Sequence, residues 1–342
     1  VGSEMCIRDR ERLFKLTDCK GRLLVLRPDN TVPIARIVAT RLKDAVLPIR
    51  LYYNQCVFTM EPSLKGRSAQ TVQTGIELIG SSSKMADLEV IATAIEVLSS
   101  CSDGEFSLEI GDIRFFRELV EKLDATDEQK ETIRDYIEAK NYPALNDMLD
   151  SIGKNEITHA LKRLPRLFGG EEVFDKAAEL FSDDKIDSVL EGLKELYKNV
   201  SAIIGSGNLT VDLGMVNRTD YYTGVIIKGY LEGYGEEVLS GGRYDKLIAD
   251  FGYDVPATGF AVNVDAVTQV ELKRRPLKAA LADVIVFAEK GYEMEALKKS
   301  DDLRKSGKKV EISLFDSIDE TVKYAEEKNI SEILTVGGKE EQ

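Results

Sequence analysis

The sequence contains only one histidine, His159, and only four cysteines, Cys6, Cys19, Cys56 and Cys101. No two cysteines have the C-x-x-C spacing of a metal or redox pair, and one histidine adds little to a zinc site. We therefore expect no metal and no cofactor, and we interpret the cysteines as reduced, mostly buried thiols. His159 lies in a helical pattern, where we expect an ordinary helix residue and not a general acid or base.

Long hydrophobic runs and an excess of basic charge are also missing. No stretch approaches the roughly 18 apolar residues of a membrane span, and no secretory signal is recognisable, so we expect a cytoplasmic protein without a membrane partner. The formal net charge of −14 gives no overall attraction to a polyanion such as nucleic acid. With 342 residues, the chain is long enough for two or three domains.

The first part of the chain predicts half of a sheet-bearing core. Residues 1–10 fit none of the elements that follow, and we interpret them as a non-native leader. Within 11–111, strands at 49–58 and 72–79 form a long hairpin whose loop carries Arg67 at a basic tip. The other elements predicted here are a strand at 22–26, helices at 31–43 and 86–99, and a strand at 106–110.

A helical insertion follows at 112–205, with breaks expected near Ala125, Asn141, Gly153 and Gly169. The second part of the core, 206–275, carries predicted strands at 209–213, 222–230 and 235–239, a helix at 243–250, and a strand and helix within 257–272.

The last segment, 276–342, alternates strands and helices in a β-α-β-α-β series. This order predicts a small α/β domain with a parallel sheet. The predicted strands lie at 284–287, 309–314 and 332–336, and the helices at 293–306 and 318–327.

Residues suited to binding concentrate in three segments of the second core part. An acid precedes two adjacent tyrosines, Tyr221 and Tyr222, whose rings in a strand point to opposite faces, so that one ring can line a pocket. In 241–245, paired glycines let the backbone turn or approach a ligand, and Arg243 offers a planar donor for a carboxylate or phosphate. A third glycine-containing segment lies at 258–261. Each segment alone is more typical of strands joined by glycine turns.

Together and in this order, these segments resemble the histidine-specific branch of class II aminoacyl-tRNA synthetases. The likeness covers residues 13–338, with 58–80 similar to motif 2, 241–245 to a histidine-specific motif and 259–264 to the start of motif 3. It implies an α+β fold: a class II synthetase-like antiparallel sheet core with a helical insertion, followed by a small α/β domain that resembles a partial anticodon-binding module.

The resemblance also implies a pocket for free histidine. Carboxylates in it would accept hydrogen bonds from ammonium or imidazole N–H groups, Thr and Gln would add neutral hydrogen bonds, and tyrosines would form a flat wall. The implied histidine-binding residues are Asp29, Thr31, Gln73, Glu77, Tyr221 and Tyr222. The candidate anion contacts are Arg67, Arg218 and Arg243.

Three arginine positions of the synthetases hold other residues here. Thr59 stands in motif 2 where an arginine holds the α-phosphate, and Asn217 stands before the tyrosine pair. Arg218 is one place later, which in a strand points to the opposite face. Asp265 and Ala266 stand where motif 3 ends in an ATP-holding arginine. Because each missing cation costs about 10²- to 10³-fold, we expect no adenylation activity and no catalytic residue.

A histidine pocket without activation chemistry is similar to that of a synthetase-like family, the regulatory subunits of ATP phosphoribosyltransferase. That resemblance implies a non-catalytic protein that forms a hetero-oligomer with a short-form catalytic subunit, supports the first step of histidine biosynthesis and transmits feedback inhibition by histidine. It further implies self-association as a dimer and no tRNA partner. The family's first helix and motif 1 are not found before Glu11, as expected for a truncated N-terminus.

Two alternatives stay open. A working histidyl-tRNA synthetase is favoured by the α/β domain after Pro276 and disfavoured by Thr59, Asn217, Ala266 and the acidic charge balance. A synthetase-like protein that binds a partner but no amino acid is disfavoured by the retained histidine-binding set.

Overall fold

The computed structural model describes residues 13–60, 68–216, 221–276 and 282–338. The chain divides into two compact units, Val1–Arg274 and Arg275–Gln342. No helix in these described ranges is both long enough and apolar enough to span a membrane.

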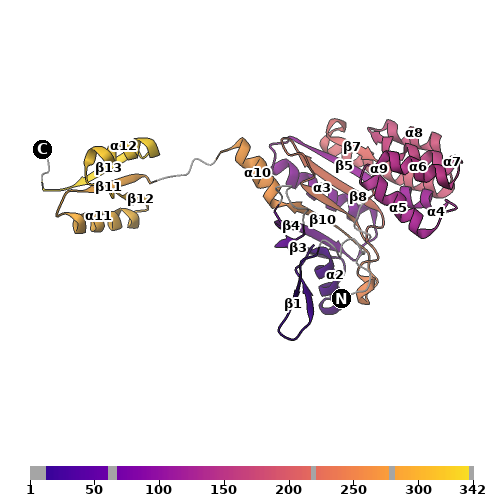
Figure 1. Ribbon diagram of the computed structural model, residues 1–342, viewed down its shortest axis with the longest axis horizontal. Coiled ribbons are helices and arrows are strands. Elements are labelled where there is room, and N and C mark those ends of the chain that lie inside the picture. The colour runs from indigo at the N-terminus through magenta and orange to yellow at the C-terminus, as the bar shows by residue number, and fades with distance from the viewer. Residues whose placement is uncertain (1–12, 61–67, 217–220, 277–281, 339–342) are drawn as a thin grey trace. The chain divides into compact units, whose positions relative to one another are not determined.

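An eight-stranded sheet forms the centre of the first unit (Figure 1). Its order is β3-β4-β10-β9-β8-β5-β7-β6, and only β5 and β7 are parallel neighbours. The predicted hairpin is confirmed, because β3 and β4 pair along their whole length. The strands are β3 Ile49–Phe58, β4 Gln70–Ile79, β5 Phe106–Asp112, β6 Phe168–Gly169, β7 Leu209–Asp212, β8 Val225–Leu231, β9 Leu239–Arg243 and β10 Ala257–Asn263.

Helix α3 (Lys84–Ser100) packs on one face of this sheet, against β4, β5, β8, β9 and β10. Ser83 begins the helix by accepting a hydrogen bond from the Ala86 amide through its Oγ. Leu98 packs so closely on β8 that a Cβ on Gly229 would lie 2.6 Å from its Cδ1. The glycine therefore lets the helix approach the strand, and the opposite face of the sheet remains for a site.

Helices α4 to α9 gather beyond the β5–β7 end of the sheet (Figure 1). The predicted breaks near Ala125, Asn141, Gly153 and Gly169 are confirmed, since each lies between two helices. The segment belongs to the same compact unit as the sheet, because α9 packs against β5, β7 and α3. The helices are α4 Ile113–Glu121, α5 Asp127–Glu138, α6 Tyr142–Ile152, α7 Glu156–Arg163, α8 Glu172–Leu180 and α9 Asp184–Ile204, with a 3-10 turn at Leu164–Arg166.

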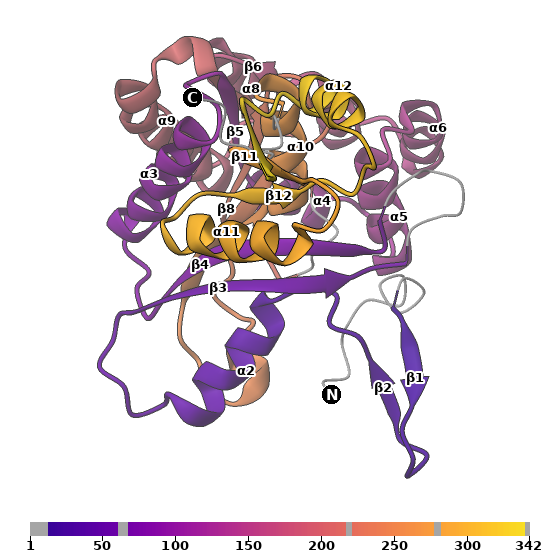
Figure 2. The same cartoon turned by 90° about the vertical axis from the view of Figure 1, so that its left-hand side faces the viewer.

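At the other end of the sheet, β1 (Lys15–Thr17) and β2 (Leu23–Val25) form a hairpin beside α2 (Thr31–Arg41) (Figure 2). The sequence predicts β2 but not β1. The hairpin projects from the unit, and all residues of both strands are exposed.

Two predictions for the second core part are wrong. The strand expected at 235–239 is β9, Leu239–Arg243, and the helix expected at 243–250 is a turn that ends in a 3-10 helix at Ala249–Phe251. Gly241 and Gly242 lie inside β9. A Cβ on Gly241 would stand 2.4 Å from the Gly259 carbonyl oxygen of β10, so β9 and β10 can approach each other this closely only because the residue is glycine. These glycines serve close strand packing and not a turn. After β10 the chain forms α10, Val264–Arg274.

The prediction of mostly buried cysteines is also wrong for the three that the structure describes. Cys19 is exposed, Cys56 and Cys101 are partly buried, and all three are free thiols.

The second unit is the α/β domain that the sequence predicts. Its three parallel strands have the order β12-β11-β13 and are joined by α11 and α12. The bounds are β11 Val284–Ala288, α11 Glu293–Lys305, β12 Val310–Ile312, α12 Ile318–Lys328 and β13 Glu332–Val336.

Candidate functional site

Small residues on the central strands hollow out the sheet face opposite α3. Strand pairing places Glu77 of β4, Gly259 of β10 and Gly242 of β9 side by side in one row. The neighbouring row on the same face, from β10 to β5, contains Ala261, Ser240, Lys228 and Glu109. Because Gly259, Gly242, Ala261 and Ser240 carry no side chain or a small one, a cavity of about 850 Å³ opens over the sheet.

Glu77 is the buried acid at one end of the cavity, with 2% of its surface exposed. Thr31 Oγ1 donates a hydrogen bond to Oε1 over 2.9 Å, and the Tyr244 hydroxyl donates to Oε2 over 2.5 Å. A Cβ on Gly259 would lie 1.9 Å from Oε2, so only glycine leaves room for this carboxylate. Burial raises the pKa of Glu77 to about 7, although both hydrogen bonds act to lower it.

Three other predicted residues lie at the same end. Asp29 Oδ1 accepts a hydrogen bond from the Val32 amide at the start of α2, which fixes its position beside Thr31. Asn30 Nδ2 donates to Gln73 Oε1 over 3.0 Å, which orients the Gln73 amide. The structure therefore brings Asp29, Thr31, Gln73 and Glu77 to one cavity from α2 and β4.

Tyr221 and Tyr222 also line the cavity, but not in the predicted arrangement. They precede β8, which begins at Val225, and their rings do not take opposite faces of a strand. The ring centroids are 4.9 Å apart, and Tyr221 also meets the Tyr244 ring edge-on at 5.7 Å. The Thr223 amide donates to the Arg243 carbonyl, which holds this pair against the end of β9. The sequence segment 241–245 thus contributes Tyr244, which is missing from the predicted set.

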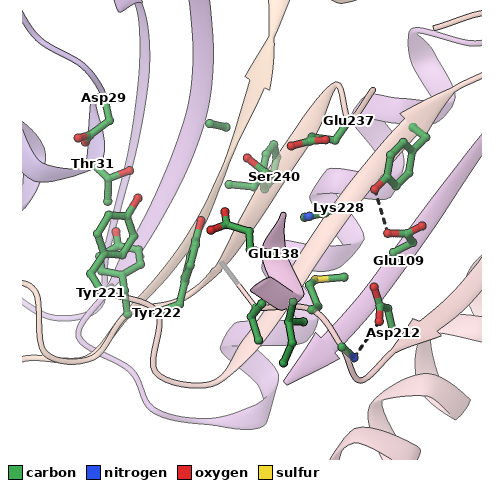
Figure 3. A pocket seen from close by; sticks show the side chains of 18 of the residues that line it. Asp29, Thr31, Glu109, Glu138, Asp212, Tyr221, Tyr222, Lys228, Glu237 and Ser240 are labelled. Atoms are coloured by element: carbon green, nitrogen blue, oxygen red, sulfur yellow. Dashed lines mark hydrogen bonds between the residues drawn. The ribbon is translucent and has the colours of Figure 1, made fainter. Parts of the chain in front are cut away.

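The other end of the cavity carries charged residues that the sequence analysis missed. Figure 3 shows Asp29, Thr31 and the tyrosine pair at one end, Glu109 and Asp212 at the other, and Lys228 and Ser240 between them. Burial raises the pKa of Glu109, which accepts a hydrogen bond from Tyr230, and burial also raises the pKa of Asp212. A charged residue within an otherwise apolar strand, such as Lys228 in β8, is the sequence signal that could have identified this end.

Of the three candidate anion contacts, the structure describes only Arg243, which does not line the cavity. Arg243 is 8% exposed and pairs with Asp87 of α3 at 2.9 Å and with Asp245 at 2.9 Å, on the face of the sheet that α3 covers. In this structure its guanidinium pairs with these two carboxylates, so the role of Arg243 as an anion contact stays a prediction. Arg67 and Arg218 lie outside the described residues.

Carboxylates dominate the described lining of the cavity. They are Asp29, Glu77, Glu109, Glu138, Asp212 and Glu237, whereas the cations are Lys140 and Lys228. Within the described part of the chain, no arginine lines it.

The family model described as Histidyl-tRNA synthetase matches residues 3–267. The ATP phosphoribosyltransferase regulatory subunit of Clostridium acetobutylicum is 42% identical, over 95% of this chain and 81% of that protein. That of Bacillus mycoides is 37% identical, over 96% of this chain and 78% of that protein. The chain belongs to the family of ATP phosphoribosyltransferase regulatory subunits.

Solved structures agree with this family. The crystal structure of an ATP phosphoribosyltransferase regulatory subunit/histidyl-tRNA synthetase from Bacillus halodurans is 30% identical, covers 96% of this chain and 84% of that chain, and has a TM-score of 0.77. Histidyl-tRNA synthetase from Nostoc shares the fold with a TM-score of 0.69 at 22% identity, over 93% of this chain and 77% of that chain. The expected α+β fold is thereby confirmed.

As a member of the regulatory-subunit family, the chain is a non-catalytic paralogue of the synthetases. Two of the positions where the resemblance places arginines carry no cation in the described structure. Thr59 follows β3 directly, and Asp265 at the start of α10 accepts a hydrogen bond from the Val72 amide. The neighbouring Ala266 is buried.

Proposed function

We propose that the cavity binds free histidine and that the chain transmits histidine feedback to a catalytic ATP phosphoribosyltransferase subunit. The Glu77 carboxylate and Asp29 suit the N–H groups of an ammonium or imidazole, and Gln73 adds a neutral amide. Tyr221, Tyr222 and Tyr244 supply an aromatic wall. The second candidate function, a protein that binds only its partner, leaves this polar set without a ligand.

The observation that carries the proposal is the charge of the cavity. Six carboxylates and two lysines line it, and no described arginine does. ATP activation of an amino acid places negative charge on a phosphoryl centre, which synthetases stabilise with fixed cations. An acidic cavity disfavours a nucleotide and favours a ligand with an ammonium group.

The catalytic partner is, in our proposal, a short-form ATP phosphoribosyltransferase subunit in the cytoplasm. The relatives are ATP phosphoribosyltransferase regulatory subunits, and a regulatory subunit implies a catalytic partner. We also propose that the chain self-associates as a dimer. Exposed apolar side chains on the β1–β2 hairpin and the residue after it support an interface there: Leu16, Leu23, Leu24, Val25 and Leu26.

Three measurements on the full chain test this function. ATP–pyrophosphate exchange with histidine should be undetectable, and robust exchange would restore the synthetase alternative. Calorimetry should detect histidine binding that Glu77→Ala or Gln73→Ala weakens about tenfold, whereas Gln70→Ala on the exposed end of β4 should not. No heat at millimolar histidine would favour the partner-only alternative. With the short catalytic subunit added, histidine should inhibit phosphoribosyl transfer.

A further inference from the structure

Lys228 occupies a central position on the floor of the cavity. It lies on β8, paired with Ser240 of β9 on one side and Glu109 of β5 on the other. Its side chain lines the cavity and is partly buried. Adjacent strands are about 4.8 Å apart, so the stem of the lysine side chain can cross β9 toward Ala261 and the end of the cavity that contains Glu77.

The ammonium group of Lys228 has no hydrogen-bond or ion-pair partner among the described residues. Its neighbour Glu109 instead accepts from the Tyr230 hydroxyl at 2.9 Å, and Asp212 accepts from the Gly214 amide at 2.8 Å. Lys228 acts on these two carboxylates only through longer-range attraction. Three N–H donors are therefore directed at the cavity without a short-range acceptor.

Lys140 differs from Lys228 in both place and exposure. It follows α5 in a turn with φ +54°, and its side chain is exposed at the rim. Lys228 is consequently the described cation best placed to act inside the cavity.

We propose that Lys228 receives the carboxylate of the amino acid bound in the cavity, an inference that rests on the proposed function. A free amino acid is a zwitterion, and its two charges need opposite partners. Glu77 and Asp29 lie at one end, and Lys228 with the Ser240 hydroxyl faces them across the small residues of β10. The ammonium of Lys228 also stands between the ligand and Glu109, so it shields the ligand carboxylate from that acid.

Two ligands that differ only in the carboxylate test this role: L-histidine and its decarboxylated analogue, histamine. Calorimetry at about pH 8 keeps both imidazoles neutral, since their pKa is near 6.5. The unmodified chain should bind histidine more tightly than histamine. Lys228→Met should weaken histidine about tenfold or more and leave histamine unchanged, because a charge-assisted bond to the carboxylate is lost. Lys228→Arg should retain the preference. Lys84→Met, which removes an exposed ion pair with Glu195 and does not line the cavity, should change neither affinity.

The inference is overturned if Lys228→Met leaves histidine binding unchanged, or weakens both ligands equally. It is also overturned if Arg218→Met, and not Lys228→Met, removes the preference for histidine. If the unmodified chain binds neither ligand, the proposed function itself fails. Matching far-ultraviolet circular dichroism of each variant shows that a loss of affinity is not a loss of fold.

Discussion

Tyr244 donates a hydrogen bond to Glu77 over 2.5 Å, and both side chains are buried. Thr31 donates to the other oxygen of the same carboxylate. The three residues come from α2, β4 and the turn after β9, which are far apart in the sequence. The position of the Glu77 carboxylate therefore depends on the assembled sheet. The contribution of each hydrogen bond to stability and to ligand affinity can be tested separately.

Tyr244→Phe should destabilise the fold by about 1 to 3 kcal/mol, because it leaves one oxygen of a buried carboxylate without its donor. Histidine affinity should fall with it. Urea denaturation and calorimetry measure the two effects. Tyr324→Phe removes a tyrosine hydroxyl that donates to Glu311 in the second unit, and as the control it should leave histidine affinity unchanged. An unchanged histidine affinity in Tyr244→Phe would contradict the assigned role.

The raised pKa of Glu77 makes stability depend on pH. Because the pKa is about 7 in the fold and ordinarily 4.5, the folded chain binds the extra proton between these values. Stability should therefore fall as pH rises from about 4.5 to 7 and change no further above that, by about 3 kcal/mol at most. Glu77→Gln should remove this component. Parallel denaturation curves of both proteins across this range measure the difference, and equal pH slopes would count against it.

The elements predictable from the sequence are those with local signals. The strand 49–58 is bounded by Pro48 and a polar loop, and its predicted and observed ends coincide. The glycine pair in 241–245 misleads, because a glycine can serve a turn or a close approach. Which of the two it serves depends on distant neighbours such as Phe260 and Tyr222.

The site, too, has one part that the sequence predicts and another that depends on contacts between distant residues. The end with Asp29, Thr31 and Glu77, for which we propose histidine binding, follows from residue types that resemble a known family in order and spacing. At the other end, Lys228 stands out in the sequence as a charge in an apolar strand, but its pairing with Glu109 follows only from the register between β8 and β5. Tyr244 was missed because the neighbouring Arg243 carries the more obvious charge, although that charge serves α3.

Gly259→Ala should abolish histidine binding. The added methyl group would stand 1.9 Å from Glu77 Oε2 and 2.4 Å from the Ile76 carbonyl oxygen, so the carboxylate or the backbone must move. Overpacking of this kind costs about 1 to 3 kcal/mol. Gly192→Ala in α9 is the control, because apart from the adjoining residues and backbone of its own helix no atom lies within 4 Å of its added Cβ. It should leave binding intact and stabilise the helix by up to about 1 kcal/mol. Normal binding by Gly259→Ala would refute the close contact.

Arg243→Met should unfold the chain more easily, by about 3 to 5 kcal/mol, because it leaves Asp87 and Asp245 without their buried cation. Arg50→Met removes an exposed pair with Glu89 and should have a far smaller effect. Guanidinium denaturation compares the two. If Arg243→Met instead lost ligand affinity at unchanged stability, the arginine would be the anion contact that the sequence suggests.

The hollow over the sheet lies where Gly242 and Gly259 have no side chain and Ala261 has only a methyl group. These residues stand on strands that are paired by backbone hydrogen bonds. The space is therefore set by the backbone positions of these paired strands. We expect ligand binding to require little reorganisation of this backbone, so that affinity depends mainly on the polar groups around the cavity floor. Recognition can thus be retuned at those surrounding positions without rebuilding the sheet beneath.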